Sequence, residues 1–443
     1  MMFRVGAAAR GAVLRAGGVG GHHAFMTQNT NYRINGARLW RALMEMAEIG
    51  ATPKGGVNRV TLTEVDRAGR ARFAEWCAAA GLSLGTDTMG NMFARREGRD
   101  PTRPPVMFGS HLDSQPTGGK FDGALGVLAG LEVMRTFDEL GIVTEAPLEL
   151  VNWTDEEGCR FGRAMMGSAV WAGVQPEAAI RALRDASGIT VAEALAAIGA
   201  EGGEPATHRP ADAFFELHIE QGPLLEAGGE AIGIVTGAQA QVWFDIVLTG
   251  RDSHAGTTPP AVRRDALTGA AEIILLVERL MRDCGEQGRG TVGRLSVHPN
   301  SPNVVPGEVR FAAEFRNPSD AEIVRLAREF PEQATALATA RGLEIVITPV
   351  FRVEATPFDP TCVDLVRASC RQRGLAAREM VSGAGHDAVH LARVVPSAMI
   401  FTPCKDGLSH NEAESITEAE AEAGAQILFD VVLARANRPL TAA

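Results

Sequence analysis

From residue 31 onward, short apolar runs typical of β-strands alternate with segments that have the spacing of amphipathic helices. In the first of these segments, Leu39, Leu43 and Met46 recur at helical intervals. We expect helices over residues 37–49, 63–81 and 124–140, and strands over 105–108, 148–153 and 214–219. Strand, polar loop and helix in this order predict an α/β domain with a mostly parallel sheet and flanking helices.

The middle of the chain has a different order of elements. Residues 241–249, 293–298, 308–316 and 343–351 are strand-like, and two long helical stretches, 264–283 and 319–341, lie between them. Strand, helix, strand, strand, helix, strand is the ferredoxin-like arrangement. From about residue 359 helix and strand alternate again, with a strand over 398–402. We therefore predict one α/β domain, residues 31–239 and 353–443, interrupted by a smaller ferredoxin-like α+β domain, residues 240–352.

The first 26 residues differ from the rest. They contain three arginines and no acidic residue, but also no serine, whereas transit peptides are rich in both Arg and Ser. We expect residues 1–30 to be a disordered leader or an upstream extension, with Met26 as an alternative start. The expected compartment is the cytoplasm, or an organelle if residues 1–26 are a transit peptide.

Composition limits the kinds of partner. The chain has 43 Lys and Arg against 54 Asp and Glu, a net charge of -11, so it lacks the basic field of a nucleic-acid-binding protein. No uninterrupted apolar run reaches the ~18 residues of a membrane helix. The six cysteines form no CxxC pair, which argues against a zinc ribbon or a disulfide framework. We expect a protein of a reducing interior that binds neither nucleic acid nor membrane.

Four loops that follow expected strands contain side chains that bind metals. They are His111-Leu112-Asp113 with Asp122, Asp155-Glu156-Glu157, His218 with Glu220, and Ser409-His410-Asn411. Taken singly, a histidine near a strand end is most often structural, and paired glutamates can be a solvated turn. Functional residues of a parallel sheet collect where its strands end, so the four loops together indicate one site. Imidazole mixed with carboxylate suits Zn²⁺ and its first-row neighbours rather than Mg²⁺ or Ca²⁺.

The segments around these residues resemble one family. They are GSHLDSQPTGGKFDGALGVLAGLEV, NWTDEEGCRF, ELHIEQGPLLE, GRDSHAGTTP, NSPNVVPGEV, SGAGHDAVH and CKDGLSHNEAE, and the resemblance covers residues 31–433. The chain is similar to the N-carbamoyl-amino-acid amidohydrolases, the branch of the M20 metallopeptidase-like superfamily that includes L-N-carbamoylases, β-ureidopropionases and allantoate amidohydrolases. The resemblance implies a catalytic α/β domain and an inserted domain that acts as a lid or dimerisation domain.

The resemblance also implies a set of metal ligands. Two divalent cations per subunit would be held by His111, Asp122, Glu157, His218 and His410, with Asp122 bridging them. A carboxylate can do this because its two oxygens span cations ~3.5–4 Å apart. Zn²⁺ is the first choice of metal, with Mn²⁺, Co²⁺ and Ni²⁺ as alternatives. Asp113 would orient the imidazole of His111.

Further residues match family positions that act on the substrate. Glu156 would be the general base and acid, and His254 would reach the partner subunit's site to stabilise the oxyanion. Gln221 would contact the ureido end of the substrate, while Asn303 and Arg316 would hold its carboxylate. From the sequence without the resemblance, a salt bridge on a sheet face and a turn former are the better interpretations of Arg316 and Asn303. His386 of the SGAGHD motif receives no role.

The function implied by the resemblance is hydrolysis of the carbamoyl C–N bond of an N-carbamoyl amino acid by a homodimer joined through the inserted domain. The substrate, a small ureido acid, is an N-carbamoyl-L-amino acid or N-carbamoyl-β-alanine, and allantoate is an alternative. A dipeptide ranks lower because family peptidases usually have a carboxylate at the position of His218. Glu156 and the five ligand positions argue against a non-catalytic metal-binding relative. The sequence has no GxSxG motif in a strand-turn-helix context, which argues against a serine amidase.

Overall fold

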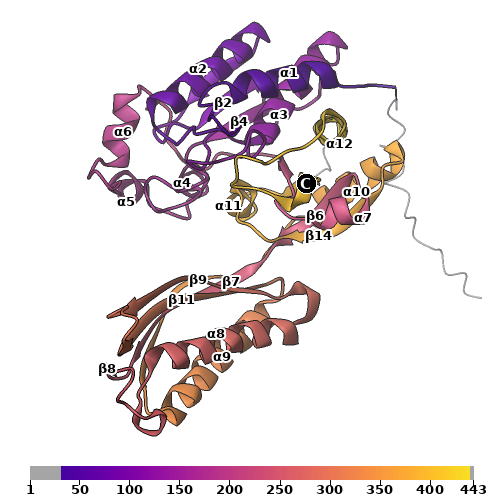
Figure 1. The fold of residues 1–443 in the computed structure, drawn as a ribbon. Helices are drawn as coiled ribbons and strands as arrows, with labels where there is room; N and C mark the ends of the chain where they lie inside the picture. Colours follow the sequence, from indigo (N-terminus) through magenta and orange to yellow (C-terminus); the bar gives the residue numbers. More distant parts are fainter. Residues whose placement is uncertain (1–30, 440–443) are drawn as a thin grey trace, which may run out of the picture.

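The computed structural model describes residues 31–439. Figure 1 shows two units: the large-sheet unit, with strands β1–β6 and β13–β15, and the small-sheet unit, with strands β7–β12. The chain enters the small-sheet unit between β6 (Ile232–Ala238) and β7 (Ala240–Thr249). It returns between β12 (Glu344–Val353) and β13 (Thr356–Pro357). The expectations for residues 1–30 lie outside the described residues.

Within residues 31–439, nine strands form the large sheet, in the order β1-β2-β4-β3-β5-β15-β6-β13 with β14 beside β6. The further bounds are β1 (Ser83–Thr86), β2 (Met92–Arg96), β3 (Val106–His111), β4 (Leu148–Trp153), β5 (Ala213–Ile219), β14 (Ala377–Ser382) and β15 (Ser397–Thr402). The central strands β4, β3, β5 and β15 run parallel, and every residue in them is buried. Burial on both faces explains why these strands are continuous apolar runs without alternation.

Helices flank this sheet. They are α1 (Gly36–Ala47), α2 (Glu64–Ala79), α3 (Ala124–Glu139), α4 (Met166–Trp171), α5 (Glu177–Arg181), α6 (Val191–Ala197), α7 (Leu224–Gly228), α10 (Pro360–Arg373), α11 (Asp387–Leu391), α12 (Glu418–Ala436) and the 3₁₀ turn η3 (Lys405–Gly407). Helix α3 contacts α12, β3 and β5, helix α12 also contacts β3, β5 and β15, and both helices are mostly buried. The predicted α/β fold class, with a mainly parallel central sheet and flanking helices, is confirmed.

The small sheet has four antiparallel strands in the order β12-β7-β11-β9, among the described residues. Its elements follow the chain as β7, α8 (Ala266–Asp283), β9 (Arg289–His298), β11 (Glu308–Asn317), α9 (Asp320–Ala340) and β12. This is the strand-helix-strand-strand-helix-strand order that the sequence predicts. A short ribbon of β8 (Ser253–His254) and β10 (Val304–Val305) and the turns η1 (Pro260–Val262) and η2 (Gly285–Gln287) complete the unit.

Each sheet has its own hydrophobic core. Helices α8 and α9 lie along one face of the small sheet (Figure 1) and enclose a cluster around Phe244, Phe315 and Phe330. The Phe330 ring lies 5.4 Å from Phe244 and 5.0 Å from Phe315, measured between centroids. Among the helices of residues 31–439, none has the length and apolar character that a bilayer span requires.

Replacing Phe330 by alanine should loosen the small sheet and leave the large sheet intact. Phe330 is fully buried, and deletion of a buried phenylalanine ring costs about 3–5 kcal/mol. Hydrogen exchange read by mass spectrometry should show faster exchange in β7 and β11 and unchanged exchange in β3 and β5. The control Val346→Ala changes a side chain that is 60% exposed and should alter neither sheet. An equal loss of protection in both sheets would contradict two separate cores.

Candidate metal centre

The parallel strands bring four chain segments to one edge of the large sheet. His111 is the last residue of β3, and His218 is the second-last residue of β5. Glu157 follows the end of β4, and His410 follows β15 after the turn η3. Because β4, β3, β5 and β15 are neighbours and run parallel, their carboxyl ends meet at the same edge. The sheet therefore gathers ligand residues that are nearly 300 positions apart in the sequence.

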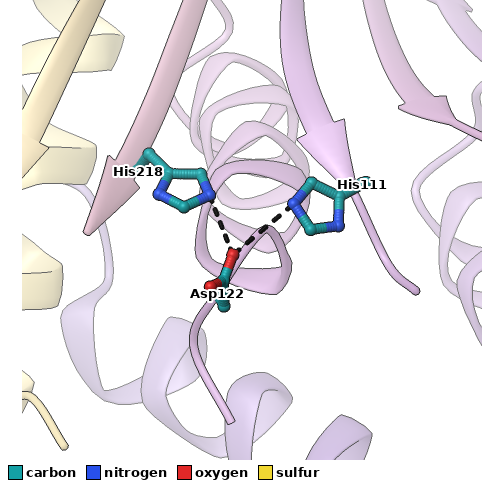
Figure 2. A group of neighbouring side chains, drawn as sticks. All are labelled: His111, Asp122 and His218. Carbon is teal, nitrogen blue, oxygen red and sulfur yellow. Dashed lines mark ion pairs between the residues drawn. The ribbon is translucent and has the colours of Figure 1, made fainter. Parts of the chain in front are cut away.

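Asp122, on the loop before α3, lies between two histidine rings. Its Oδ1 is 3.1 Å from Nε2 of His218 and 3.6 Å from Nε2 of His111, and Figure 2 shows both rings directed at this carboxylate. The next residue, Gly123, has φ 64° and lies against the His111 ring, where a Cβ would overlap it. Only a residue without a side chain fits here, so Gly123 permits the close approach of Asp122 to both histidines.

The second oxygen of Asp122 faces a different pair of ligands. Its Oδ2 is 3.6 Å from Nε2 of His410, which is 3.3 Å from Oε2 of Glu157. Two groups of possible ligands result, His111-Asp122-His218 and Asp122-Glu157-His410, each with its atoms within 4.8 Å of one another. The first group is buried, whereas the His410 side chain is 51% exposed. Asp122 belongs to both groups and offers one oxygen to each.

The two buried histidines have the tautomer that metal binding requires. Nδ1 of His111 lies 3.0 Å from the backbone oxygen of Asp113, and Nδ1 of His218 lies 2.9 Å from that of Ile219. Since a carbonyl only accepts, each Nδ1 carries the proton and each Nε2 carries the lone pair. The Nε2 of His218 accepts from the backbone N–H of Gly123 at 3.2 Å. Nε2 of His111 is buried and has no hydrogen-bond partner. A divalent cation beside Asp122 would supply the missing partner, so the residues fit a metal.

The electrostatics of the site also favour a cation. Burial raises the pKa of Glu157 to about 8, and the charge of Asp122 adds to the effect. Burial likewise raises the pKa of Glu156 well above its ordinary value. Burial raises the pKa of Asp122 too, but His218 and His111 outweigh it and hold that pKa well below its ordinary value. Buried carboxylates are stabilised when they are paired or coordinate a metal, and a dication would stabilise their ionised forms.

Asp113 and Glu156 lie beside these ligands. The carboxylate of Asp113 is 3.7 Å from Nδ1 of His111, but its closer contacts are the backbone N–H groups of Glu156 and Glu157, each at 3.3 Å. Asp113 thus fixes the turn after β4 as well as contacting His111 through its backbone oxygen. Oε2 of Glu156 lies 3.6 Å from Nε2 of His111. The Glu156 carboxylate therefore borders the same space as the ligands.

The remaining residues expected from the sequence divide between the two units. Gln221 lies beside the candidate metal ligands, because its Nε2 donates to Oδ2 of Asp122 at 2.9 Å. Arg316, on β11, donates to the backbone oxygen of Gly383 in the large-sheet unit and pairs with Glu314 at 3.0 Å. His254 lies elsewhere, on β8 of the small-sheet unit, and Asn303 directly precedes β10; neither belongs to a ligand group.

Two further contacts were not predicted from the sequence. Gln115 donates from its side chain to Oε2 of Glu157 at 2.8 Å and from its backbone to Oε1 at 3.1 Å. Glu414 accepts from the backbone N–H of Asp122 at 3.1 Å. Gln115 lies inside the motif GSHLDSQP and Glu414 inside LSHNEAE. Each also has a contact in which the donor is a backbone N–H, and such a donor leaves no mark in a side-chain pattern.

Fold and site together define an α/β protein with a place for divalent metal at the carboxyl ends of its parallel strands. The family model of peptidase family M20/M25/M40 matches residues 107–434. An N-carbamoyl-L-amino-acid amidohydrolase of Rhizobium meliloti is 45% identical over 92% of this chain and 98% of its own length. An allantoate amidohydrolase of Bacillus subtilis is 32% identical over 87% of this chain and 94% of its length.

A solved structure agrees with these relatives. The crystal structure of an amidase of the hydantoinase/carbamoylase family from Burkholderia multivorans has 49% sequence identity and a TM-score of 0.90, covering 92% of this chain and 100% of that one. The chain belongs to the peptidase family M20/M25/M40 and to its hydantoinase/carbamoylase branch of amidohydrolases. The family resemblance predicted from the motifs is confirmed.

Proposed function

We propose that this protein hydrolyses the carbamoyl C–N bond of an N-carbamoyl amino acid with two divalent metal ions, releasing the amino acid, CO₂ and ammonia. The observation that carries the proposal is Asp122, which offers one oxygen to each of two ligand groups. The name of the relative that is 45% identical supports the substrate class. Allantoate is the second candidate substrate, supported by the more distant relative of that name.

The two ligand groups support the proposal of two cations. His111 and His218 would hold one, Glu157 and His410 would hold the other, and Asp122 would be shared by both. When bound, the cations would supply Lewis-acid polarisation of the ureido carbonyl and would lower the pKa of the attacking water. Zn²⁺ suits the mixture of imidazole and carboxylate best, with Mn²⁺, Co²⁺ and Ni²⁺ as alternatives.

Glu156 is the proton carrier. Its Oε2, 3.6 Å from Nε2 of His111, lies beside the ligand groups without belonging to either. Since the carboxylate is adjacent to the space where the ureido group must lie, it can take a proton from the attacking water and deliver it to the leaving nitrogen. Asp113 holds Glu156 in place through the backbone N–H at 3.3 Å.

Arg316 and Asn303 contact the substrate from different subunits. Arg316 pairs with Gln241 at one end of β7, whereas His254 and Asn303 lie beyond Thr249 at the other end. Ten residues of β7 at about 3.3 Å each separate these ends by about 30 Å. Arg316 and Asn303 of one chain therefore cannot hold the same carboxylate. Arg316 of one protomer binds it together with Asn303 and His254 of a second protomer.

His254 is prepared to donate a hydrogen bond. Its Nδ1 accepts from the backbone N–H groups of Gly256 at 3.0 Å and Thr257 at 3.3 Å, so the proton of the neutral ring lies on Nε2. An exposed N–H of this kind can stabilise the oxyanion that forms when water adds to the ureido carbonyl. His254 itself is exposed, which suits a residue that completes a site on another protomer.

A homodimer through the small-sheet unit brings this histidine to the second site. Apolar side chains are exposed near the His254 loop, namely Val262 (54%) on η1 and Leu267 (38%) and Leu275 (63%) on α8. Leu267 and Leu275 are eight residues apart and so lie on the same side of the helix. Such a stripe is stabilised when a second copy covers it. The small-sheet unit thus acts as the dimerisation domain.

Ammonia release from N-carbamoyl-L-methionine, N-carbamoyl-β-alanine and allantoate tests the substrate class. We expect the metal-loaded protein to hydrolyse a carbamoyl amino acid fastest, to lose activity in EDTA and to regain it with Zn²⁺, Mn²⁺, Co²⁺ or Ni²⁺. Glu156→Gln should keep its metal content and lose at least a hundredfold in kcat. Fastest turnover of allantoate would shift the assignment to the second candidate. Full activity after complete metal removal would refute the mechanism.

The metal content of two variants tests the shared ligand. The unaltered protein should bind two equivalents of Zn²⁺ per chain after dialysis, measured by plasma mass spectrometry. Asp122→Asn should weaken both sites because its carboxylate belongs to each group, whereas Glu157→Gln should retain about one equivalent on His111 and His218. Two tightly bound equivalents in Asp122→Asn would show that the carboxylate does not bridge.

Complementation between two inactive variants tests the contribution of His254 across subunits. Co-expressed Glu156→Ala and His254→Ala chains should form mixed dimers in which one of the two sites is complete. Random pairing then gives about a quarter of the activity of the unaltered enzyme. The control pair Glu156→Ala and Asp122→Asn should give no recovery, because both changes damage the chain's own site. A lack of recovery in the first pair would refute the contribution of His254 across subunits.

A further inference from the structure

Glu414 connects the two loops that present Asp122 and His410. Its side chain is 4% exposed, and its Oε1 accepts from the backbone N–H groups of Phe121 at 2.9 Å and Asp122 at 3.1 Å. The backbone N–H of Glu414 donates to the oxygen of Asn411, next to His410, at 3.0 Å. One carboxylate thus joins the turn after His410 to the loop before α3.

A hydroxyl group strengthens the same connection. Oγ of Ser409 donates to Oδ2 of Asp122 at 2.7 Å and lies 3.4 Å from Oε2 of Glu414. Glu414 therefore borders Asp122 both at its backbone and, through Ser409, at its side chain. The two contacts restrain the position of the Asp122 carboxylate and its rotation.

The loop around Asp122 is shaped to receive Glu414. A Cβ at Gly119 would overlap the Glu414 carboxylate, so the loop can close on this side chain only with glycine at that position. On the other side, the Phe121 ring stacks on Trp40 with centroids 5.5 Å apart. Without Glu414, the buried N–H groups of Phe121 and Asp122 would have no acceptor, and the loop would have to move to find one.

We propose that Glu414 is a positioning residue that fixes Asp122 relative to His410 and thereby sets the separation of the two cation sites. The inference rests on the proposed dinuclear site. Asp122 must direct one oxygen at His111 and His218 and the other at His410, so a small shift of its loop changes both distances together. Groups that orient metal ligands in this way control metal affinity without touching the metal.

Two variants and a matched control test the proposal. Glu414→Ala removes the acceptor, whereas Glu414→Gln keeps one oxygen that can accept from both N–H groups. Glu412→Gln is the control, because Glu412 lies in the same turn but contacts Thr52 and Lys54. We expect affinity for the second equivalent of Co²⁺ to fall at least tenfold in Glu414→Ala and less in Glu414→Gln, with a changed Co²⁺ absorption spectrum. Glu412→Gln should match the unaltered protein.

Kinetics separate positioning from a general loss of structure. In Glu414→Ala, kcat should fall at least tenfold while KM changes less than twofold, and Glu414→Gln should recover part of kcat. A merely structural role would lower the melting temperature of the metal-free protein and leave the Co²⁺ spectrum of the folded fraction unchanged. Unaltered Co²⁺ affinity and spectrum in both Glu414 variants would overturn the proposal. If Glu414→Ala does not fold, Glu414→Gln decides by the same criteria.

A metal-free measurement keeps this inference distinct from the proposed function. Hydrogen exchange of the metal-free protein should be at least tenfold faster for the amides of Phe121 and Asp122 in Glu414→Ala, and unchanged in Glu412→Gln. Faster exchange together with a single bound Co²⁺ in the unaltered protein would support the hydrogen bonds and refute the dinuclear site. Unchanged exchange in Glu414→Ala would refute the positioning role, whatever the metal content.

Discussion

Buried negative charge at one edge of the large sheet is the constraint on which the site depends. Glu156 and Glu157 of the turn after β4 meet Asp122 of the loop before α3 there, and burial favours the protonated form of each carboxyl group. Only Asp122 is held ionised by adjacent imidazoles. The chain therefore folds into an arrangement that is electrostatically incomplete without cations. Metal binding and the stability of this edge are consequently linked, since any cation that binds the folded state stabilises it.

Much of the fold could be predicted because burial leaves a clear pattern. The strand expected over 148–153 coincides with β4, and the helix over 124–140 with α3 to within one residue. The strand expected over 105–108 continues as β3 to His111, because the polar residues Ser110 and His111 are themselves buried and paired with β4. Likewise β9 begins four residues before the expected 293. It is an exposed edge strand that carries no apolar pattern at its start.

The candidate site was predictable in its residue types but not in its geometry. Position after a strand identifies His111, His218 and Glu157 as neighbours, since parallel strands end at a common edge. It cannot show that the Asp113 carboxylate binds the backbone N–H groups of Glu156 and Glu157, because backbone acceptors and donors exist at every residue. The distance between Arg316 and Asn303 could not be predicted from the sequence either. It follows from the register of β7 with β11, which pairs Arg316 with Gln241.

The way the small-sheet unit is attached bears on how a rotation would displace Arg316 and His254. The chain leaves and returns through β6 and β13, which are paired at Ala238 and Thr356, so the two crossings lie side by side. Rotation about such a narrow connection leaves the large sheet intact. Arg316 lies near this connection and contacts Gly383, so a rotation there would move it little. The ribbon that carries His254 lies about 30 Å away along β7, so the same rotation would move it far. Under the proposed function, the residue proposed to hold the substrate carboxylate would stay in place beside the candidate metal ligands. The residue proposed to donate to the oxyanion would be delivered by a domain movement or by a second protomer.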